Sequence, residues 1–216
     1  KQMNNIIIIG TSDLFEMTET SLDPQKYKIR GYLAPEENSN WIYKNYPYLG
    51  DDSLLESDSY RDHSFVVALF DNKRRQNICD ILESQNRPLL RVIHPSSVVM
   101  ASAKIENGTT ISFLCTISSS SKIGKCVVIR SHAHIAHDVS IGDYSFVAPG
   151  VCLLAGAQVG KGSLIGANAT IFPGVKIGDQ CKIGVGSIVR HDVPSETTYI
   201  SKYLTYSKSR KESDEL

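Results

Sequence analysis

The stretch from Arg130 to Asp138 concentrates side chains that could move protons. It contains three histidines, and the last of them, His137, is followed directly by Asp138. An imidazole titrates near neutral pH, so it can take a proton from an attacking amine or hydroxyl group. A neighbouring carboxylate can fix the tautomer of the ring and stabilise the imidazolium that forms. We therefore interpret His137 as a candidate general base and Asp138 as the residue that holds it.

Two other interpretations of the histidines His132, His134 and His137 remain open. One is a metal cluster, but neighbouring side chains along a strand point in opposite directions. No cysteine or carboxylate completes a ligand set at a familiar spacing either, so we expect no metal site. The other is a row of solvated surface histidines on a coil, and it applies to His137 as well.

A six-residue period runs through the same half of the chain. From Val99 to Val189 every sixth residue is Ile, Val or Leu. This pattern is typical of a parallel β-helix, in which each hexapeptide covers its apolar face by stacking on its neighbours. With three hexapeptides in a coil, Ala155 would stack on His137 at roughly 4.8 Å. A backbone amide of the unhindered corner Ala155-Gly156 could then face an oxyanion beside the base.

The first 95 residues follow a different pattern, in which buried strands alternate with helices. Strands are predicted near residues 5–10, 28–33, 64–70 and 89–93, and an amphipathic helix over 72–86. The alternation indicates a small α/β domain with a truncated Rossmann-like parallel sheet. The predicted units are therefore an α/β domain over 1–95, a β-helix over 96–195 and a C-terminal extension over 196–216.

Two turns at the carboxyl ends of these strands could bind an anionic ligand. Free amides at a helix start attract phosphate, and open α/β sheets bind ligands at this edge. The candidate residues are Gly10, Thr11, Ser12, Asp71, Asn72 and Arg75. The first turn has one glycine where a dinucleotide fingerprint has three, so a tight turn and a solvated helix start remain alternatives.

Composition argues against several classes of protein. Lys and Arg together number 23, as do Asp and Glu, so no net charge favours nucleic acid or an anionic membrane surface. The apolar run at residues 6–9 is too short for a membrane span or a signal-peptide core. We therefore expect a cytoplasmic protein without membrane insertion, whose five cysteines are free thiols.

The sequence resembles the nucleotide-sugar N-acetyltransferases of the left-handed β-helix superfamily, which include the bacillosamine-pathway and perosamine N-acetyltransferases. The likeness is carried by the start at Gly10, by residues 67–75, and most specifically by Ala136-His-Asp138 with Gly142-Asp-Tyr144. This resemblance implies a left-handed parallel β-helix after the α/β domain. It also implies acetyl-CoA as cosubstrate, a nucleotide-linked amino sugar as acceptor, and a homotrimer with active sites between adjacent β-helices.

The resemblance assigns roles to individual residues as well. His137 matches the catalytic base and Asp138 its acidic partner, and Ala155 matches a position whose amide meets the thioester carbonyl. The implied cofactor-binding residues are Ala155, Gly156, Ala167 and Val185, and the six N-terminal candidates fall on the nucleotide-sugar side. The sequence departs from the family where Thr11-Ser-Asp-Leu-Phe15 replaces a Gly-rich run ending in His.

We therefore predict an acetyl-CoA-dependent N-acetyltransferase. The amino group of a nucleotide-activated sugar, a 4-amino-4,6-dideoxy sugar used in O-antigen or capsule synthesis, would attack the thioester directly. Two alternatives remain, namely O-acylation of a sugar or another small molecule and a non-catalytic β-helical binding or scaffold protein.

Overall fold

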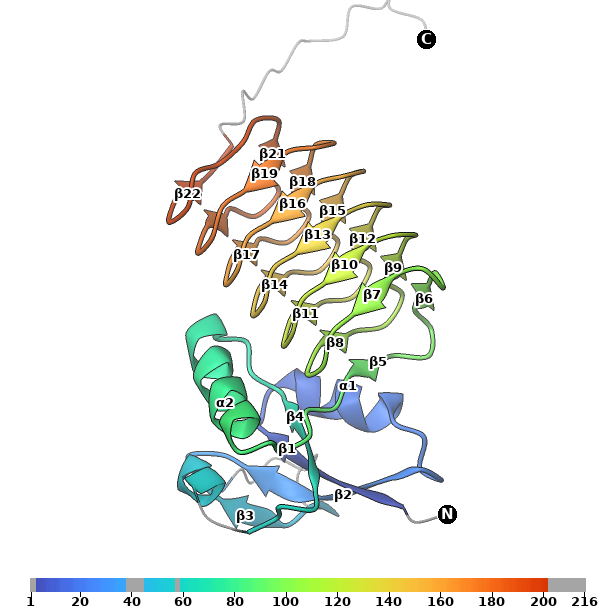
Figure 1. Ribbon diagram of the computed structural model, residues 1–216, viewed down its shortest axis with the longest axis vertical. Helices are drawn as coiled ribbons and strands as arrows, with labels where there is room; N and C mark the ends of the chain where they lie inside the picture. Colours follow the sequence, from blue (N-terminus) through green and yellow to red (C-terminus); the bar gives the residue numbers. More distant parts are fainter. Residues whose placement is uncertain (1–2, 38–44, 57–58, 202–216) are drawn as a thin grey trace, which may run out of the picture.

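The computed structural model describes residues 3–37, 45–56 and 59–201, which form a small α/β domain beneath a long three-sided β-helix (Figure 1). The α/β domain contains β1 (Asn4–Ile9), α1 (Asp13–Ser21), β2 (Tyr27–Leu33), β3 (Tyr48–Gly50), the 3-10 helix η2 (Asp52–Glu56), β4 (Ser64–Val67) and α2 (Asn72–Ser84). Its parallel sheet has the strand order β3-β2-β1-β4.

The central strand β1 is buried on both faces, as its run of four isoleucines predicts. Ile6 and Ile8 pack with residues of α1 on one face, while Ile7 and Ile9 pack with residues of α2 on the other. The predicted α/β domain with a parallel sheet is confirmed. The strand predicted over 64–70 ends at Val67, and β3 lies in a segment for which no strand was predicted.

The β-helix consists of short parallel strands, most of which pair with the strand one coil, or 18 residues, further on; the last pairing, of Lys182 with Thr198, spans 16 residues. These are β5 (Val92–Ile93), β6 (Val98–Val99), β7 (Lys104–Ile105), β8 (Thr110–Ile111), β9 (Thr116–Ile117), β10 (Lys122–Ile123), β11 (Val128–Ile129), β12 (His134–Ile135), β13 (Ser140–Ile141), β14 (Phe146–Val147), β15 (Cys152–Leu153), β16 (Gln158–Val159), β17 (Leu164–Ile165), β18 (Thr170–Ile171), β19 (Lys176–Ile177), β20 (Lys182–Ile183), β21 (Ile188–Val189) and β22 (Thr198–Tyr199). The parallel β-helix predicted from the six-residue period is thus confirmed.

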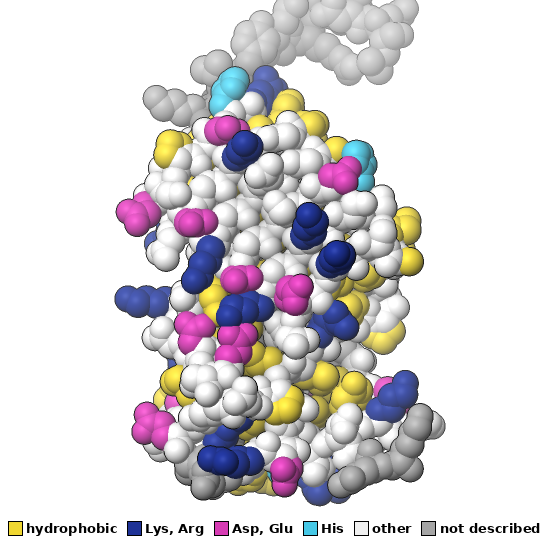
Figure 2. All heavy atoms as spheres, in the orientation of Figure 1, with side chains coloured by type: hydrophobic (Ala, Val, Ile, Leu, Met, Phe, Trp, Pro, Cys, Tyr) yellow, Lys and Arg dark blue, Asp and Glu magenta, His cyan; other side chains and the backbone are white. Residues whose placement is uncertain are grey.

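The coils build three sheets, which we name by what lies outside them. The domain-side sheet (β5, β8, β11, β14, β17, β20, β22) faces the α/β domain. The lysine sheet (β7, β10, β13, β16, β19) carries Lys104, Lys122 and Lys176, and charged side chains are spread over this face (Figure 2). The neutral sheet (β6, β9, β12, β15, β18, β21) begins its six strands with Val98, Thr116, His134, Cys152, Thr170 and Ile188.

The β-helix extends past both predicted limits. The strand β5 pairs with β8, so the first coil begins at Val92, ahead of the predicted boundary at Pro95. The strand β22 pairs with β20 and continues the domain-side sheet beyond residue 195. Most of the predicted C-terminal extension, residues 202–216, lies outside the described residues. In the described part of the chain, the helices are all too short or too polar to cross a membrane.

Candidate active site

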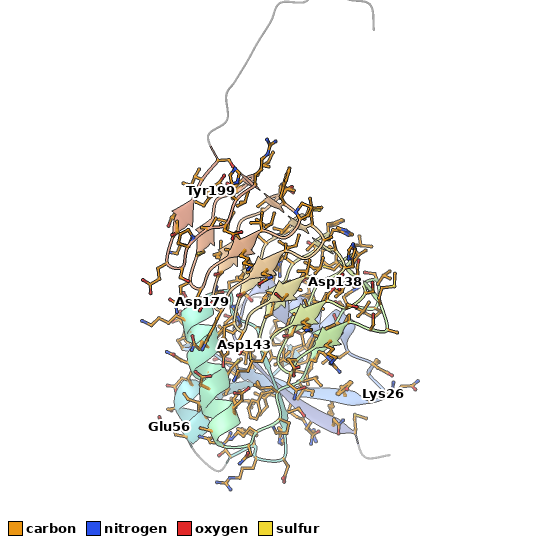
Figure 3. The ribbon with its side chains drawn as sticks, turned by 45° about the horizontal axis from the view of Figure 1, so that its top comes forward. Lys26, Glu56, Asp138, Asp143, Asp179 and Tyr199 are labelled. Atoms are coloured by element: carbon orange, nitrogen blue, oxygen red, sulfur yellow. The ribbon has the colours of Figure 1, made fainter. Side chains whose placement is uncertain are left out.

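The candidate base lies at a coil corner, between β12 of the neutral sheet and β13 of the lysine sheet. His137 Nδ1 and Asp138 Oδ2 are 2.7 Å apart. The carboxylate favours the tautomer with the proton on Nδ1, which leaves Nε2 as the nitrogen that can accept a proton. The two side chains are 61% and 63% exposed, so a substrate can reach them. In Figure 3, Asp138 and Asp143 lie on opposite edges of the lysine sheet.

The stacking predicted from 18-residue coils brings Ala155 and Gly156 to the same corner. The N–H of Gly156 donates to the carbonyl oxygen of His137 at 3.0 Å, and the carbonyl of Ala155 accepts from Gly174 in the next coil. In the described part of the chain, the N–H of Ala155 donates to no protein group. A free amide one coil above an imidazole can stabilise an oxyanion that forms beside that base.

Ala167 and Val185 lie at a different corner, between the domain-side sheet and the neutral sheet. Ala167 is half-buried and packs against the core, whereas Val185 is 71% exposed. The width of the neutral sheet separates them from His137. One copy of the chain therefore does not bring the four predicted cofactor-binding residues together.

The turn after β1 is built as the sequence indicates. Gly10 has a φ of +110°, and a Cβ at this position would lie 2.5 Å from the carbonyl oxygen of Ala68, so only glycine fits. Ser12 is the N-cap of α1, because its Oγ accepts from Leu14 N at 3.3 Å and donates to Ala68 O at 2.8 Å. Thr11 lies half-buried between them. This turn stands at the carboxyl edge of the sheet, where open α/β folds bind ligands.

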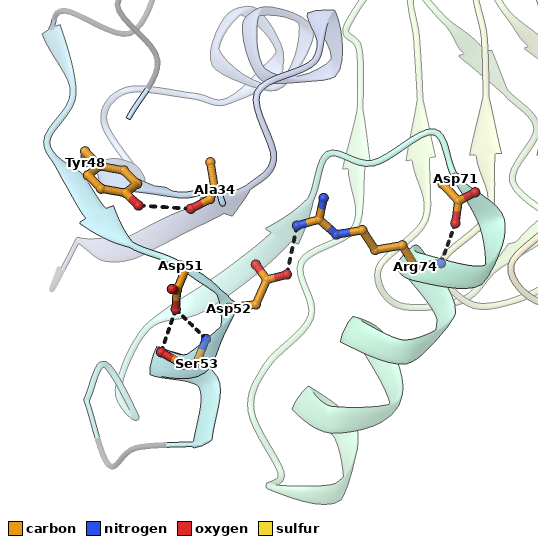
Figure 4. A network of polar contacts seen from close by, with 7 residues as sticks. All are labelled: Ala34, Tyr48, Asp51, Asp52, Ser53, Asp71 and Arg74. Atoms are coloured by element: carbon orange, nitrogen blue, oxygen red, sulfur yellow. Dashed lines mark hydrogen bonds and ion pairs between the residues drawn. The ribbon is translucent and has the colours of Figure 1, made fainter. Parts of the chain in front are cut away.

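Asp71 and Asn72 bind other parts of the chain. Asp71 is the N-cap of α2, and its Oδ1 accepts from Arg74 N at 2.6 Å, while the Arg74 guanidinium donates to Asp52 (Figure 4). The amide of Asn72 donates to the carbonyl oxygen of Gly162 in the β-helix at 3.0 Å. Both side chains thus fix α2 in place.

Arg75 has a structural role in place of the predicted phosphate contact. Its side chain is fully buried, and its three nitrogens donate to the carbonyl oxygens of Cys126, Leu69 and Tyr144 at 2.6–2.9 Å. Burial lowers the pKa of Arg75 to about 10, which leaves the side chain charged at neutral pH. The guanidinium therefore joins α2 to the β-helix and offers no face to a phosphate.

Arg130 is a residue of this region that sequence reasoning did not single out. It forms an ion pair with Asp13 at the start of α1 and lies over the Phe70 ring, 5.1 Å from its centroid. Phe70 meets Phe146 edge to face at 5.7 Å. The one available signal was its place at the start of the histidine stretch. Arg130 lies at the same β-helix corner as Ala167 and Val185. Its ion pair with Asp13 joins this corner to the turn of Gly10 and Ser12.

The site residues therefore form two groups on opposite edges of the neutral sheet. The base group contains His137, Asp138, Ala155 and Gly156, and the domain group contains the turn 10–12 with Arg130. Across the ranges that the structure describes, no three His, Cys, Asp or Glu side chains come together as a possible metal site.

Comparisons with known proteins agree with this architecture. Residues 120–155 match the family model described as bacterial transferase hexapeptide (six repeats), and residues 156–190 match the hexapeptide repeat of succinyl-transferase. GDP-perosamine N-acetyltransferase of Escherichia coli O157:H7 is 34% identical over 91 residues, 42% of this chain and 41% of that protein. The match thus spans about two fifths of the length of this curated relative.

Solved structures extend the likeness to almost the whole chain. A histidine-to-asparagine mutant of perosamine N-acetyltransferase from Caulobacter crescentus, in complex with CoA and GDP-perosamine, is 26% identical. That likeness covers 93% of this chain and 95% of the other, with a TM-score of 0.84. The acetyltransferase domain of PglB from Neisseria gonorrhoeae in complex with acetyl coenzyme A shares the fold, at 22% identity and a TM-score of 0.85 over 93% and 97% of the two chains. The chain therefore folds as a left-handed β-helix that carries hexapeptide repeats, and its predicted resemblance to the perosamine N-acetyltransferases is confirmed.

Proposed function

We propose that the protein is an acetyl-CoA-dependent N-acetyltransferase that acts on the amino group of a nucleotide-linked sugar. The observation that carries the proposal is the corner at which His137 is held by Asp138 and lies one coil below the free amide of Ala155. A base, its orienting carboxylate and an oxyanion donor are the groups that acyl transfer from a thioester needs. The perosamine N-acetyltransferase that the chain resembles binds CoA and GDP-perosamine, which supports both substrates.

The reaction proceeds by direct attack. The amine nitrogen adds to the thioester carbonyl while Nε2 of His137 accepts its proton, and the Ala155 amide stabilises the oxyanion. The intermediate collapses to the amide, and the C–S bond breaks to release CoA as its thiolate, which takes up the proton. A thioester is reactive enough that no covalent enzyme intermediate is required. We propose a 4-amino-4,6-dideoxy sugar destined for a surface glycan as the acceptor, and the cytoplasm as the place where the enzyme works.

We further propose that the active enzyme is a homotrimer in which the neutral sheets face one another. The residues that begin the strands of this sheet carry no formal charge, and its margin exposes Met100 and Leu114 at 51% and 54%. Patches of this kind are typical of protein–protein contacts. Three copies arranged in this way place the base group of one copy beside Arg130, Ala167 and Val185 of the next. This assembly accounts for the separation of the two groups within one chain.

Replacing the base tests the proposal. His137→Asn keeps a polar side chain of similar size but removes the proton acceptor, so kcat should fall by about 10²–10⁴-fold. Acetylation is followed by CoA release with GDP-, UDP- and dTDP-linked 4-amino sugars, and mass analysis of the product separates an N-acetyl from an O-acetyl group. The control is His63→Asn, the same substitution just before β4, at the edge of the α/β sheet opposite the turn 10–12. It should leave turnover unchanged. Full activity of His137→Asn would contradict the mechanism.

A further inference from the structure

The His-Asp-Val sequence of the base corner occurs a second time in the chain. His137-Asp-Val139 is followed 54 residues later by His191-Asp-Val193, about three coils further along, in a shortened last coil where Val193 pairs with Ile177. Both lie where the chain leaves a strand of the neutral sheet, β12 in one case and β21 in the other. The second copy therefore stands on the same edge of the β-helix as the first.

The two aspartates have different partners. Asp138 Oδ2 lies 2.7 Å from His137 Nδ1, whereas Asp192 Oδ1 accepts from the backbone N–H of Lys176 at 2.8 Å. Asp192 thus closes the last turn of the coil and does not orient a histidine. The second copy is not a second base.

Between the two His-Asp-Val motifs, the edge of the β-helix has open space outside it. The two intervening corners are Ala155-Gly156 and Pro173-Gly174. A Cβ placed on Gly174 would meet no atom within 4 Å, and one on Gly156 would meet only the backbone of Gly174, at 3.9 Å. The outside of both corners is open space, so a long, thin ligand can lie along the edge.

A cationic group stands at the far end of this edge. Arg190 immediately precedes His191 and is exposed, and its guanidinium lies over the Phe172 ring, 5.1 Å from the centroid. The ring holds the planar group without using its hydrogen-bond donors, which are suited to phosphate oxygens. The edge therefore has a base at one end, two bare corners in the middle, and Arg190 with His191 at the other end.

We infer that Arg190, with His191 beside it, binds the phosphates at the nucleotide end of CoA. Three stacked coils rise by about 14 Å at roughly 4.8 Å each. The pantetheine arm has about as many backbone bonds as four extended residues, or about 14 Å. A thioester placed at His137 and Ala155 thus puts the pyrophosphate beside Arg190. This inference rests on the proposed function and specifies how the cosubstrate is recognised.

Arg190→Gln tests the assignment, because it removes the charge but keeps a polar side chain. The kcat/KM for acetyl-CoA should fall about tenfold, whereas kcat/KM for S-acetylpantetheine, which lacks the nucleotide, should not change. The Kd for CoA, measured by calorimetry, should rise by the same factor. Lys104→Gln, an equal change of charge on the lysine sheet near the opposite end of the β-helix, should leave all of these values at the wild-type level.

The outcomes separate the inference from the proposed function. An unchanged Kd for CoA in Arg190→Gln, with a wild-type enzyme that acetylates normally, overturns the phosphate assignment and leaves the function standing. If kcat/KM falls equally for acetyl-CoA and for S-acetylpantetheine, Arg190 acts on the fold or on the chemical step, and the assignment is also overturned. A wild-type protein that neither binds CoA nor uses acetyl-CoA overturns both proposals.

Discussion

The His137–Asp138 pair is solvent-exposed, and this exposure limits how the carboxylate can contribute to the proposed reaction. Because Asp138 is 63% exposed, its attraction to the imidazolium is screened by water. In the proposed mechanism its main contribution is then to hold Nδ1 and fix the tautomer, through the contact of 2.7 Å. An orienting group of this kind affects the rate of the reaction and not the stability of the fold.

Asp138→Asn should lower kcat by about 10²–10⁴-fold, because an amide in this position can stabilise the wrong tautomer of His137. The melting temperature should stay near the wild-type value, since the side chain is largely in solvent. Steady-state kinetics and a thermal melt measure the two effects. Asp23→Asn, the same change at a carboxylate that is 40% exposed in the α/β domain, is the control. A kcat within twofold of wild type would show that Asp138 does not orient the base.

At the level of single residues, the sequence could predict which groups lie close together where neighbours in the chain, or in the coil register, are also neighbours in space. His137 and Asp138 are adjacent, and Ala155 follows from the 18-residue coil. Arg75 could not be interpreted in this way, because the carbonyl groups that it contacts lie as far as 70 residues away in the chain. Such contacts depend on how the β-helix packs on α2.

The junction between the α/β domain and the β-helix depends on α2. Arg75 donates to carbonyl groups on both sides of the junction, and Tyr144 of the β-helix donates to Asp80 of α2 at 2.5 Å. Carbonyl groups buried without a donor destabilise a fold, so loss of the Arg75 side chain should weaken the junction.

Arg75→Met fills a similar volume but leaves the buried carbonyl groups without donors. The free energy of unfolding should fall by on the order of 3 kcal/mol. Denaturation in urea, followed by circular dichroism, measures the loss. Arg74→Met is the neighbouring control; its ion pair with Asp52 is 38% and 32% exposed, so about 1 kcal/mol or less should be lost. Equal losses in the two variants would contradict the role given to Arg75.

Among the elements, long or repeated signals were the ones that sequence analysis could predict. The β-helix follows from a period sustained over many hexapeptides, and β1 from an unbroken run of isoleucines. The strand β3 is three residues long and lies at the edge of the sheet, so no periodic pattern marks it. The strand β5 precedes the regular period and was placed in the α/β domain, although its partner is β8.

At the level of the whole molecule, the proposed trimer makes activity depend on assembly. The neutral sheet separates the base group from Arg130 in one copy, and in the proposed trimer a neighbouring copy joins the two groups. A change that leaves each chain folded but separates the copies should therefore abolish acetyl transfer.

Cys152→Asp places a carboxylate in the middle of the neutral sheet, where three copies would bring like charges together without water. The protein should become a folded monomer without transferase activity, as measured by sedimentation and CoA release. Ser140→Asp, the same change on the lysine sheet, should remain trimeric. A trimeric, active Cys152→Asp protein would contradict the proposed interface.

The backbone of the coil corners has a consequence for how this scaffold tolerates change. Leu114, Asp138 and Tyr144 have φ values of +57°, +58° and +59°, a conformation that costs a residue other than glycine about 1 kcal/mol. Asp138 and Tyr144 keep side chains that hold the base and join the domains. Tyr144 is buried in the core, so its side chain outweighs this cost, whereas the Asp138 side chain is 63% exposed. At position 138 a glycine would therefore favour the folded backbone, and the gain in stability would come at the expense of the carboxylate beside His137.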